Sequence, residues 1–166
     1  MMRQINKRIV PSALMAETRV PDVTPGVIAK YALNDEQVLL AKLRYNRVID
    51  IFTGMTCYSL QSHLRATIPK MGHVEMDEIY LGLNSRGEHY IFPIHAIKVG
   101  AKLMFEQIKR DFAICAASFP SFNCRVIAAQ FMKDDIIVLF DVSKTKNSIA
   151  IYAEKHYRLV SPQEMI

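Results

Sequence analysis

The sequence lacks the features that would mark a membrane, secreted or repeat protein. No apolar run reaches the roughly 18–20 residues that a membrane-spanning helix needs. The start of the chain carries Arg3, Lys7 and Arg8, but only a short apolar stretch, interrupted by Pro11, follows. This is a poor signal peptide, so we expect a cytoplasmic protein with no membrane partner. Internal repeats and low-complexity segments are missing as well.

Cysteine is scarce, and common catalytic motifs are missing. Cys57, Cys115 and Cys124 lie far apart and form no CxxC pair. Their odd number and wide spacing fit neither a disulfide framework nor a zinc site, so we expect small buried thiols. The chain also has no Gly-rich phosphate loop, GxSxG elbow, HExxH pair or Cys/His cluster. The enzyme classes that depend on those motifs therefore have no support in the sequence.

The composition that is present belongs to an ordinary globular domain. The 166 residues are 51% apolar and 22% charged, which is enough for one domain with a real core. The net charge of +5 permits a polyanionic partner such as DNA, although many cytosolic proteins are equally basic. Charge alone therefore favours nucleic acid only weakly.

Two regions are expected along the chain. Residues 1–33 hold four helix-breaking Pro and Gly residues and an excess of basic side chains, so they are expected to form an N-terminal extended arm. The alternative is a leader that packs Ile9, Leu14 and Val27 on the body. Residues 34–166 are expected to form a single core domain.

The core region shows alternating helical and strand patterns. Helical periodicity begins at Asn34, which forms a capping box with Gln37, and continues until Thr53-Gly54. Further elements are predicted by the same reasoning: helices over about 57–67 and 101–118, and strands over 125–132, 135–142, 149–153 and 156–160. This order predicts an α/β or α+β fold.

The stretch Val74–Gly100 is the most informative part of the sequence. Apolar residues alternate from Ile79 to Leu83, and Asn84-Ser85-Arg86-Gly87 is typical of a tight hairpin turn. A second β-rich run, His89–Ile97, follows. We therefore predict a hairpin whose pairing brings the start of the first strand close to the end of the second.

This hairpin places an acidic pair beside a polar strand end. Asp77 and Glu78 enter the first strand, and His95, Ile97 and Lys98 end the second. Phosphodiester hydrolysis needs divalent cations, and Mg²⁺ prefers carboxylate oxygens. Nuclease sites commonly add a lysine two positions after a second ligand, because residues i and i+2 of a strand share a face.

The runs MDEIYLGL and GEHYIFPIHAI resemble the PD-(D/E)XK nuclease-like superfamily, and specifically a group of bacterial endonucleases. The likeness extends from about Ile5 to the C-terminus through RYNRVIDIFTG, CYSLQSHLR and EKHYRLV. It implies a restriction-endonuclease-like fold, with a mixed central sheet flanked by helices, and a Mg- or Mn-dependent deoxyribonuclease. It also implies a longer parent protein of which this chain is the C-terminal part.

The resemblance assigns the metal ligands. Asp77 matches the metal-binding and catalytic aspartate of the family, with Glu78 as an accessory ligand. An early helix of the family supplies another carboxylate, for which Glu36 and Asp50 are the candidates. The region predicted as the second helix offers only Gln61.

Two positions depart from the family pattern. His95 stands where Gln or Glu is expected, and Ile97 stands where the catalytic lysine is expected. An imidazole ligand at His95 would favour manganese or zinc over magnesium, and the alternative is a non-catalytic histidine. Lys98 replaces the lysine only if a bulge, favoured by Pro93, re-aims its side chain.

These departures leave two functions open. The chain is either a DNA endonuclease, weakened or inactivated by its degenerate motif, or a non-catalytic DNA-binding or assembly module of the same fold. Lys109, Arg110, Lys144 and Lys146 are the candidate nucleic-acid contacts. For Lys109 and Arg110, the alternative is that they belong to a solvated helix face of mixed charge, which also carries Asp111. No aromatic-interleaved platform for single strands is evident in the sequence. A homodimer or a larger assembly also stays open.

Overall fold

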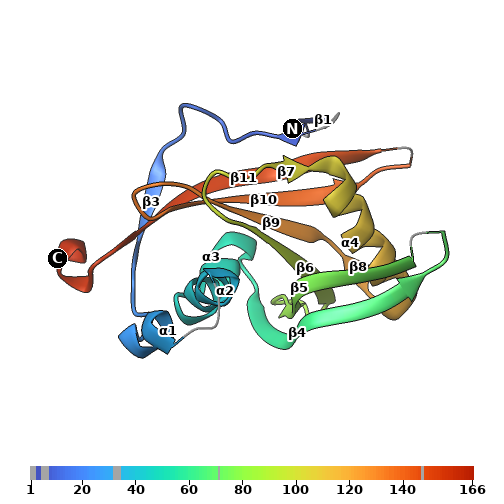
Figure 1. Ribbon diagram of the computed structural model, residues 1–166, viewed down its shortest axis with the longest axis horizontal. Coiled ribbons are helices and arrows are strands. Elements are labelled where there is room, and N and C mark those ends of the chain that lie inside the picture. The colour runs from blue at the N-terminus through green and yellow to red at the C-terminus, as the bar shows by residue number, and fades with distance from the viewer. Residues whose placement is uncertain (1–2, 5–7, 32–34, 71, 147) are drawn as a thin grey trace.

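The computed structural model describes residues 3–4, 8–31, 35–70, 72–146 and 148–166 (Figure 1). These residues form a nine-stranded mixed sheet, a two-stranded sheet and helices, which confirms the predicted mixed α and β class. The elements are β1 Arg3–Gln4, β2 Arg8–Ile9, β3 Glu17–Pro21, α1 Gly26–Tyr31, α2 Asp35–Tyr45, α3 Val48–Thr53, β4 Thr56–Ile68, β5 Gly72–Leu83, β6 His89–Ile97, β7 Leu103–Met104, α4 Phe105–Ser118, β8 Asn123–Cys124, β9 Val126–Phe131, β10 Ile136–Lys144, β11 Ile149–Val160 and the 3₁₀ helix η1 Pro162–Met165.

The large sheet is mixed because one helical crossover joins two antiparallel halves. Its strand order is β1-β11-β10-β9-β6-β5-β4, with β3 beside β11 and β8 beside β6. Strands β4, β5 and β6 pair antiparallel, as do β9, β10 and β11. Helix α4 carries the chain from β6 to β9, which pair in parallel, as a βαβ connection requires.

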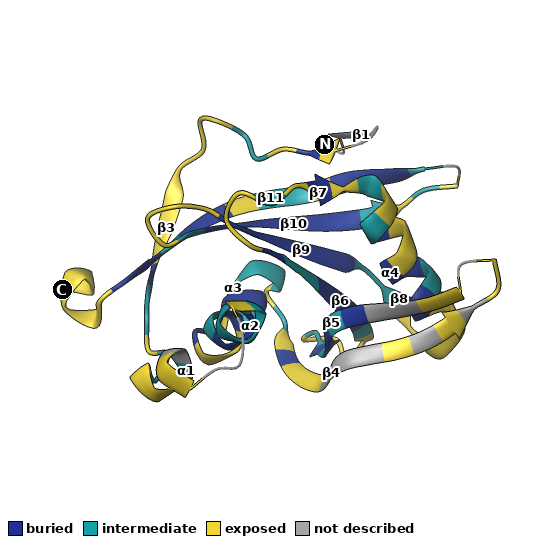
Figure 2. Ribbon diagram, viewed as in Figure 1, coloured by how far each residue is buried: buried dark blue, intermediate teal, exposed yellow. Residues whose placement is uncertain are grey.

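Helices cover both faces of this sheet (Figure 1). On one face, Leu43 of α2 and Ile49 of α3 pack with Phe92 of β6. On the other face, Ile108 of α4 packs with Phe140 of β10. Alternate residues of each strand therefore enter different cores, and the central strands are dark, that is buried, along their length in Figure 2.

Residues 57–67 form most of β4 and not the predicted helix. The strand pairs with β5 from Thr56 opposite Leu83 to Ile68 opposite Gly72, with one irregularity between Ser59 and Gln61. A local helical preference is worth only tenths of a kcal/mol per residue, so long-range pairing of this extent overrides it. The prediction was wrong because the pairing partner is not visible in the local pattern.

The other helix predictions were right in place and wrong at their ends. The helix predicted from Asn34 is split into α2 and α3 at Arg47, whose φ of 54° is left-handed and cannot continue a helix. Its predicted N-cap, Asn34, lies outside the described residues. The helix predicted over 101–118 is α4, which begins only at Phe105 because β7 precedes it.

The strand predictions after α4 are confirmed with small shifts. The predicted strands 125–132 and 135–142 are β9 and β10. The two short strands predicted over 149–153 and 156–160 are one continuous strand, β11, which pairs with β10 across a single bulge after Asp141. A bulge adds a residue without ending the strand, so the sequence pattern changes phase and suggests a break.

The described part of residues 1–33 lies against the sheet. Strand β1 pairs with β11, and β3 runs parallel to the other half of β11. Ile9 is buried, as the packing alternative expected, but Leu14 is 98% exposed and Val27 is also exposed. The region therefore adds strands to the sheet edge. No helix of the described chain is long and apolar enough to cross a membrane.

Two of the cysteines correct the expectation of free thiols. Cys115, near the end of α4, and Cys124 of β8 form a disulfide. The chain reverses between them and brings their Cα atoms to 6.6 Å, within the range that a disulfide spans. Their separation of nine residues carries no motif, so the sequence did not indicate the pair. Cys57 is free and buried, as expected.

Candidate functional site

One pocket gathers four of the five residues that the sequence predicted as catalytic groups or metal ligands. It has a volume of about 550 Å³ and opens where β6 ends beside α2 and the start of α4. We call it the acidic pocket, and it is lined by Asp35, Glu36, Leu39, Asp77, His95, Ala96, Ile97, Lys98, Ala101, Lys102 and Gln107. Glu36, Asp77, His95 and Lys98 were all predicted from the sequence. The fold therefore brings together residues from three separate segments of the chain.

Asp77 is held in place by the strand beside it. The pairing of Glu78 with Ile94 sets β5 against β6, so Asp77 lies next to the end of β6. One carboxylate oxygen, Oδ2, accepts a hydrogen bond of 2.9 Å from the backbone N–H of Ala96 and lies 3.8 Å from Nδ1 of His95. The predicted approach of the acidic strand to the end of β6 is therefore present, and it fixes the orientation of this carboxylate.

Glu78 lies on the opposite face of β5, because neighbouring strand residues point to opposite sides. Its side chain is wholly buried, pairs with Arg44 of α2 and accepts a hydrogen bond of 2.9 Å from Ser59 Oγ. It does not line the acidic pocket. The structure thus splits the predicted acidic pair, and it gives Glu78 a structural contact to Arg44 in place of the predicted metal contact.

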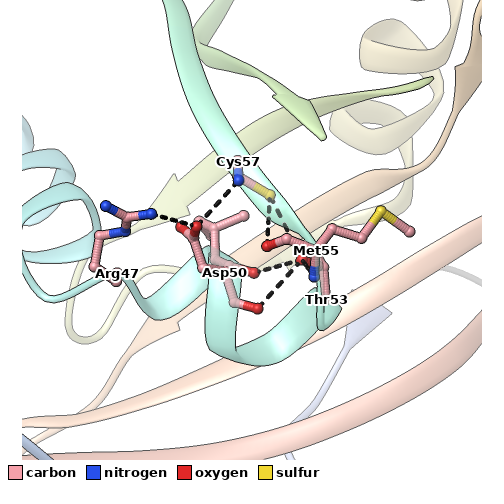
Figure 3. A network of polar contacts seen from close by, with 6 residues as sticks. Arg47, Asp50, Thr53, Met55 and Cys57 are labelled. Atoms are coloured by element: carbon pink, nitrogen blue, oxygen red, sulfur yellow. Dashed lines mark hydrogen bonds and ion pairs between the residues drawn. The ribbon is translucent and has the colours of Figure 1, made fainter. Parts of the chain in front are cut away.

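Asp50, the other predicted helical carboxylate, supports a turn between α3 and β4 (Figure 3). Its Oδ2 accepts hydrogen bonds from Arg47 at 2.8 Å and from the backbone N–H of Cys57 at 3.0 Å. Nearby, Thr53 Oγ1 donates to the carbonyl of Ile49 at 2.8 Å. Asp50 is therefore committed to local structure, and it does not line the acidic pocket.

His95 is a largely buried imidazole at the back of the acidic pocket. Its Nδ1 lies 3.6 Å from Oδ2 of Asp111 and accepts or donates no hydrogen bond to a described residue. Burial lowers the pKa of His95, and the Glu36 carboxylate together with a hydrogen bond to Gln107 offsets only part of that effect. The neutral imidazole is therefore favoured, which is the form that binds a metal or accepts a proton.

Asp111 was assigned to a solvated helix face, and the structure corrects this. The side chain is 2% exposed and projects from α4 toward His95. Burial raises the pKa of Asp111 well above its usual range, and the negative charge of Asp77 raises it further. The sequence does contain a signal for this placement, because Ile108, Asp111 and Cys115 follow the i, i+3, i+7 spacing of a buried helix face.

The end of β6 departs from the nuclease pattern as the sequence indicated. Ile97, at the position of the expected lysine, is 4% exposed and belongs to a hydrophobic cluster with Leu103 and Phe112. Lys98 lines the acidic pocket because it follows the last residue of β6, where strand alternation has ended. The expected bulge at Pro93 is not seen, since Pro93 pairs with Ile79 in regular register.

Three further residues of the acidic pocket were missed by sequence reasoning. Asp35 adds a carboxylate beside Glu36, Lys102 adds a second ammonium group, and Gln107 reaches the pocket from the first turn of α4. Lys102 lies in the β6–β7 connection and has no pattern that would mark it. The pocket therefore combines carboxylates on one side with two lysines from the segment after β6.

The donor set of the acidic pocket fits a hard divalent cation better than a structural metal. Among the described residues, no three His, Cys, Asp or Glu side chains converge closely enough to hold an ion by themselves. Mg²⁺ and Mn²⁺ need few protein ligands, because water and substrate oxygens complete their coordination. Zn²⁺ in a closed site would need four ligands from the protein. The carboxylates of Glu36 and Asp77 are the residues that would hold the ion.

The predicted nucleic-acid contacts lie away from the acidic pocket. Lys109 of α4 lines a second pocket of about 290 Å³ together with Lys144, the last residue of β10, and Lys146 of the β10–β11 connection. Arg110 is exposed on α4 but does not line that pocket. Three of the four predicted basic residues are thus brought together, although Lys109 is more than thirty positions from the other two in sequence.

Comparison of the chain with protein-family models, with curated proteins and with solved structures finds no match. The likeness to PD-(D/E)XK nucleases therefore stays a prediction from the sequence motifs.

Proposed function

We propose that this chain is a nuclease-like domain that hydrolyses DNA phosphodiesters in the acidic pocket with Mg²⁺ or Mn²⁺. The observation that carries the proposal is the meeting of Glu36 and Asp77 with Lys98 and Lys102 in one cavity. Phosphodiester cleavage needs carboxylates to hold a cation and positive charge to neutralise the phosphate. Both kinds of group are present in a pocket at the end of β6.

Each residue of the acidic pocket has a definite part in this proposal. Glu36 and Asp77 would hold the cation, which when bound lowers the pKa of a water molecule and stabilises phosphate charge. The Ala96 N–H orients the Asp77 carboxylate through the bond described above. Neutral His95 is placed to accept a proton, and the ammonium groups of Lys98 and Lys102 would neutralise the phosphate oxygens. The proposed activity is cytoplasmic, as expected from the sequence.

A second function, DNA binding without catalysis, is favoured by one specific observation. Ile97 occupies the position of the catalytic lysine and is built into a hydrophobic cluster, where no charged side chain replaces it. An apolar side chain cannot stabilise phosphate charge, so catalysis depends on Lys98 and Lys102 alone. If these two lysines do not substitute, the acidic pocket is a remnant, and the domain binds DNA through its basic residues.

A cleavage assay separates the two functions. Supercoiled, linear duplex and single-stranded DNA are incubated with the protein in Mg²⁺, in Mn²⁺ and in EDTA. We expect the wild type to cleave DNA only when metal is present, and we expect Asp77→Ala to lower the cleavage rate about 100-fold or more. The double variant that combines Lys98→Ala and Lys102→Ala should also cleave more slowly. Asp134→Ala, in the exposed β9–β10 turn, is the matched control and should cleave normally.

If the wild-type protein cleaves none of these substrates in either metal, the catalytic proposal is wrong. DNA affinity in EDTA that falls steeply with salt would then support the non-catalytic module.

A further inference from the structure

A groove whose chemistry differs from that of the acidic pocket lies along α4, β8 and the end of β10. It consists of the 290 Å³ pocket described above and an adjoining pocket of about 570 Å³. Phe112 and Lys144 line both pockets, so the two adjoin each other. Figure 1 shows α4 on the same side of the view as β8 and the β10–β11 connection. We call the combined feature the aromatic groove.

The lining of the aromatic groove is basic and contains no carboxylate among the described residues. Its cationic side chains are Arg125, Lys144, Lys109 and Lys146. Arg125 is paired with Asp141, whereas no ion pair joins the three lysines to a carboxylate in the described part of the chain. These three lysines are therefore available to an anionic ligand, in contrast to the acidic pocket.

Aromatic rings form the other part of the lining. Phe122 is 42% exposed, and its ring stands edge-on to Phe119 at 6.3 Å and to His89 at 6.4 Å. Tyr90 lies deeper, beneath the guanidinium of Arg125 at 5.7 Å. An exposed ring that is braced by its neighbours is a surface on which a planar base can stack.

The rings are positioned by rigid contacts. Phe119, Phe122 and Tyr90 come from the end of α4, the following turn and β6, and the Cys115–Cys124 disulfide ties this turn to the helix. The N–H of Phe122 also donates to the carbonyl of Phe119 at 3.2 Å. The aromatic platform is thus assembled by the fold from separate segments. This explains why the sequence shows no interleaved aromatic pattern.

We infer that the aromatic groove binds single-stranded DNA, with a base stacked on Phe122 and phosphates at Lys144, Lys146 and Lys109. Base stacking on aromatic rings combined with lysines along the backbone is how proteins hold single strands without reading sequence. A duplex keeps its base faces covered, so it can use the lysines but not the ring. The inference takes its ligand class from the proposed function, but it does not depend on the metal site.

The groove and the acidic pocket are separate enough to be tested separately. Tyr90 lies in the groove and His95 in the acidic pocket, five residues apart along β6, which corresponds to about 17 Å. A strand of a few nucleotides can span this distance. Binding at the groove would then hold a single-stranded segment close to the carboxylates of Glu36 and Asp77.

The direct test uses Phe122→Trp. The natural chain has no tryptophan, so this variant carries a single indole at the platform. Titration with an oligo-dT strand in EDTA should quench the indole fluorescence, and the matching duplex should leave it unchanged. Fluorescence anisotropy of labelled oligo-dT should show that Phe122→Ala binds the strand about 5- to 150-fold more weakly than the wild type does. Tyr58→Ala removes another exposed ring, on β4, and should bind normally.

The lysines are tested by salt dependence. Replacing Lys144 and Lys146 together by Ala should lower the slope of log affinity against log salt by about 1.4, while Lys133→Ala should not change it. Equal affinity for duplex and single strand, unchanged binding by Phe122→Ala, or no quenching in Phe122→Trp would overturn the inference.

The outcomes also separate this inference from the proposed function. Asp77→Ala should lose metal-dependent cleavage and keep its oligo-dT affinity in EDTA. Quenching without any cleavage by the wild type would leave the groove in place and make the catalytic proposal wrong. Cleavage without quenching would support the catalytic proposal and would overturn the assignment of the groove.

Discussion

Replacing Asp111 by Asn tests the buried part of the site that connects α4 to His95. Asp111 is 2% exposed, and its Oδ2 has no hydrogen-bond partner among the described residues. The substitution keeps the shape of the side chain and removes its ability to ionise. The pH-dependent part of the stability difference between the variant and the wild type therefore reports chiefly the ionisation of this carboxyl.

The direction and steepness of the effect follow from the raised pKa. Burial, with the Asp77 charge, raises the pKa of Asp111 above the value of about 3.9 for an unfolded aspartate. Above about pH 4 the unfolded chain loses this proton while the folded chain keeps it. The contribution of Asp111 to the free energy of unfolding of the wild type is therefore fully present below about pH 4. As the pH rises, this contribution falls by about 1.4 kcal/mol per pH unit until the pKa of the folded state is reached.

The assay is urea unfolding of the wild type and of Asp111→Asn at a series of pH values from 4 to 7, in EDTA. The stability of Asp111→Asn relative to the wild type should rise with pH at up to about 1.4 kcal/mol per unit, starting near pH 4. A difference in the free energy of unfolding that stays constant with pH reflects only the contacts of the amide side chain in Asp111→Asn. The lowered pKa of His95 acts in the opposite direction, and the comparison largely removes it because both proteins contain that residue.

Asp134→Asn makes the same chemical change in an exposed turn and is the matched control. A difference between Asp111→Asn and the wild type that stays flat from pH 4 to 7 would refute the placement of Asp111 in a buried, poorly solvated site. So would a variant that becomes less stable than the wild type as the pH rises, since that result would mean a charged and stabilised carboxylate.

Two further predictions concern the charges that brace the sheet. Arg44→Ala should lower the free energy of unfolding by about 3 kcal/mol, because it removes the cation that pairs with the wholly buried Glu78 carboxylate. Adding Glu78→Gln should restore most of the loss, and equal losses in the single and double variants would contradict this. Burial alone would raise the pKa of Glu154, but hydrogen bonds with His156 and Ser12 outweigh burial and lower the pKa. The ionised Glu154 carboxylate therefore stabilises the folded state above about pH 4.3, and this stabilisation is lost as the pH falls. Glu154→Gln should remove that acid-sensitive part and speed amide exchange at Ser12, whose N–H the carboxylate accepts at 2.8 Å; unchanged exchange would count against it.

The sequence predicted the parts of the site that depend on local pattern. The two-residue period around Ile79, together with the turn at Asn84, was enough to place Asp77 beside His95, because hairpin register follows from the turn. The helical start near Glu36 was likewise visible. These features lie within one element or one hairpin, where alternation and capping are informative.

The parts that failed depend on contacts between distant segments. Residues 57–67 were read as a helix because nothing local shows their pairing along β5, and that long antiparallel contact decides the structure. The groove around Phe122 escaped notice for the same reason, since its rings and lysines come from separate elements. The neighbouring positions 77 and 78 show the limit most clearly, because only the fold determines which carboxylate reaches the pocket.

Asp111 is an intermediate case. Its position on the apolar face of α4 is readable from the spacing of Ile108 and Cys115, yet its charged neighbours Lys109 and Arg110 suggested a solvated face. A charged residue on a buried helix face costs stability unless it has a role or a partner. That conflict was a usable signal for the site.

The most direct test of the central claim is metal binding by calorimetry, with Mg²⁺ and Mn²⁺ titrated into the wild type, Asp77→Ala and the exposed-site control Asp134→Ala. The account predicts that at least one of the two metals binds the wild type and the control, and that this binding is lost in Asp77→Ala. Binding that is the same in all three proteins, or absent from all three, would contradict the assignment of the acidic pocket as a metal-dependent nuclease site.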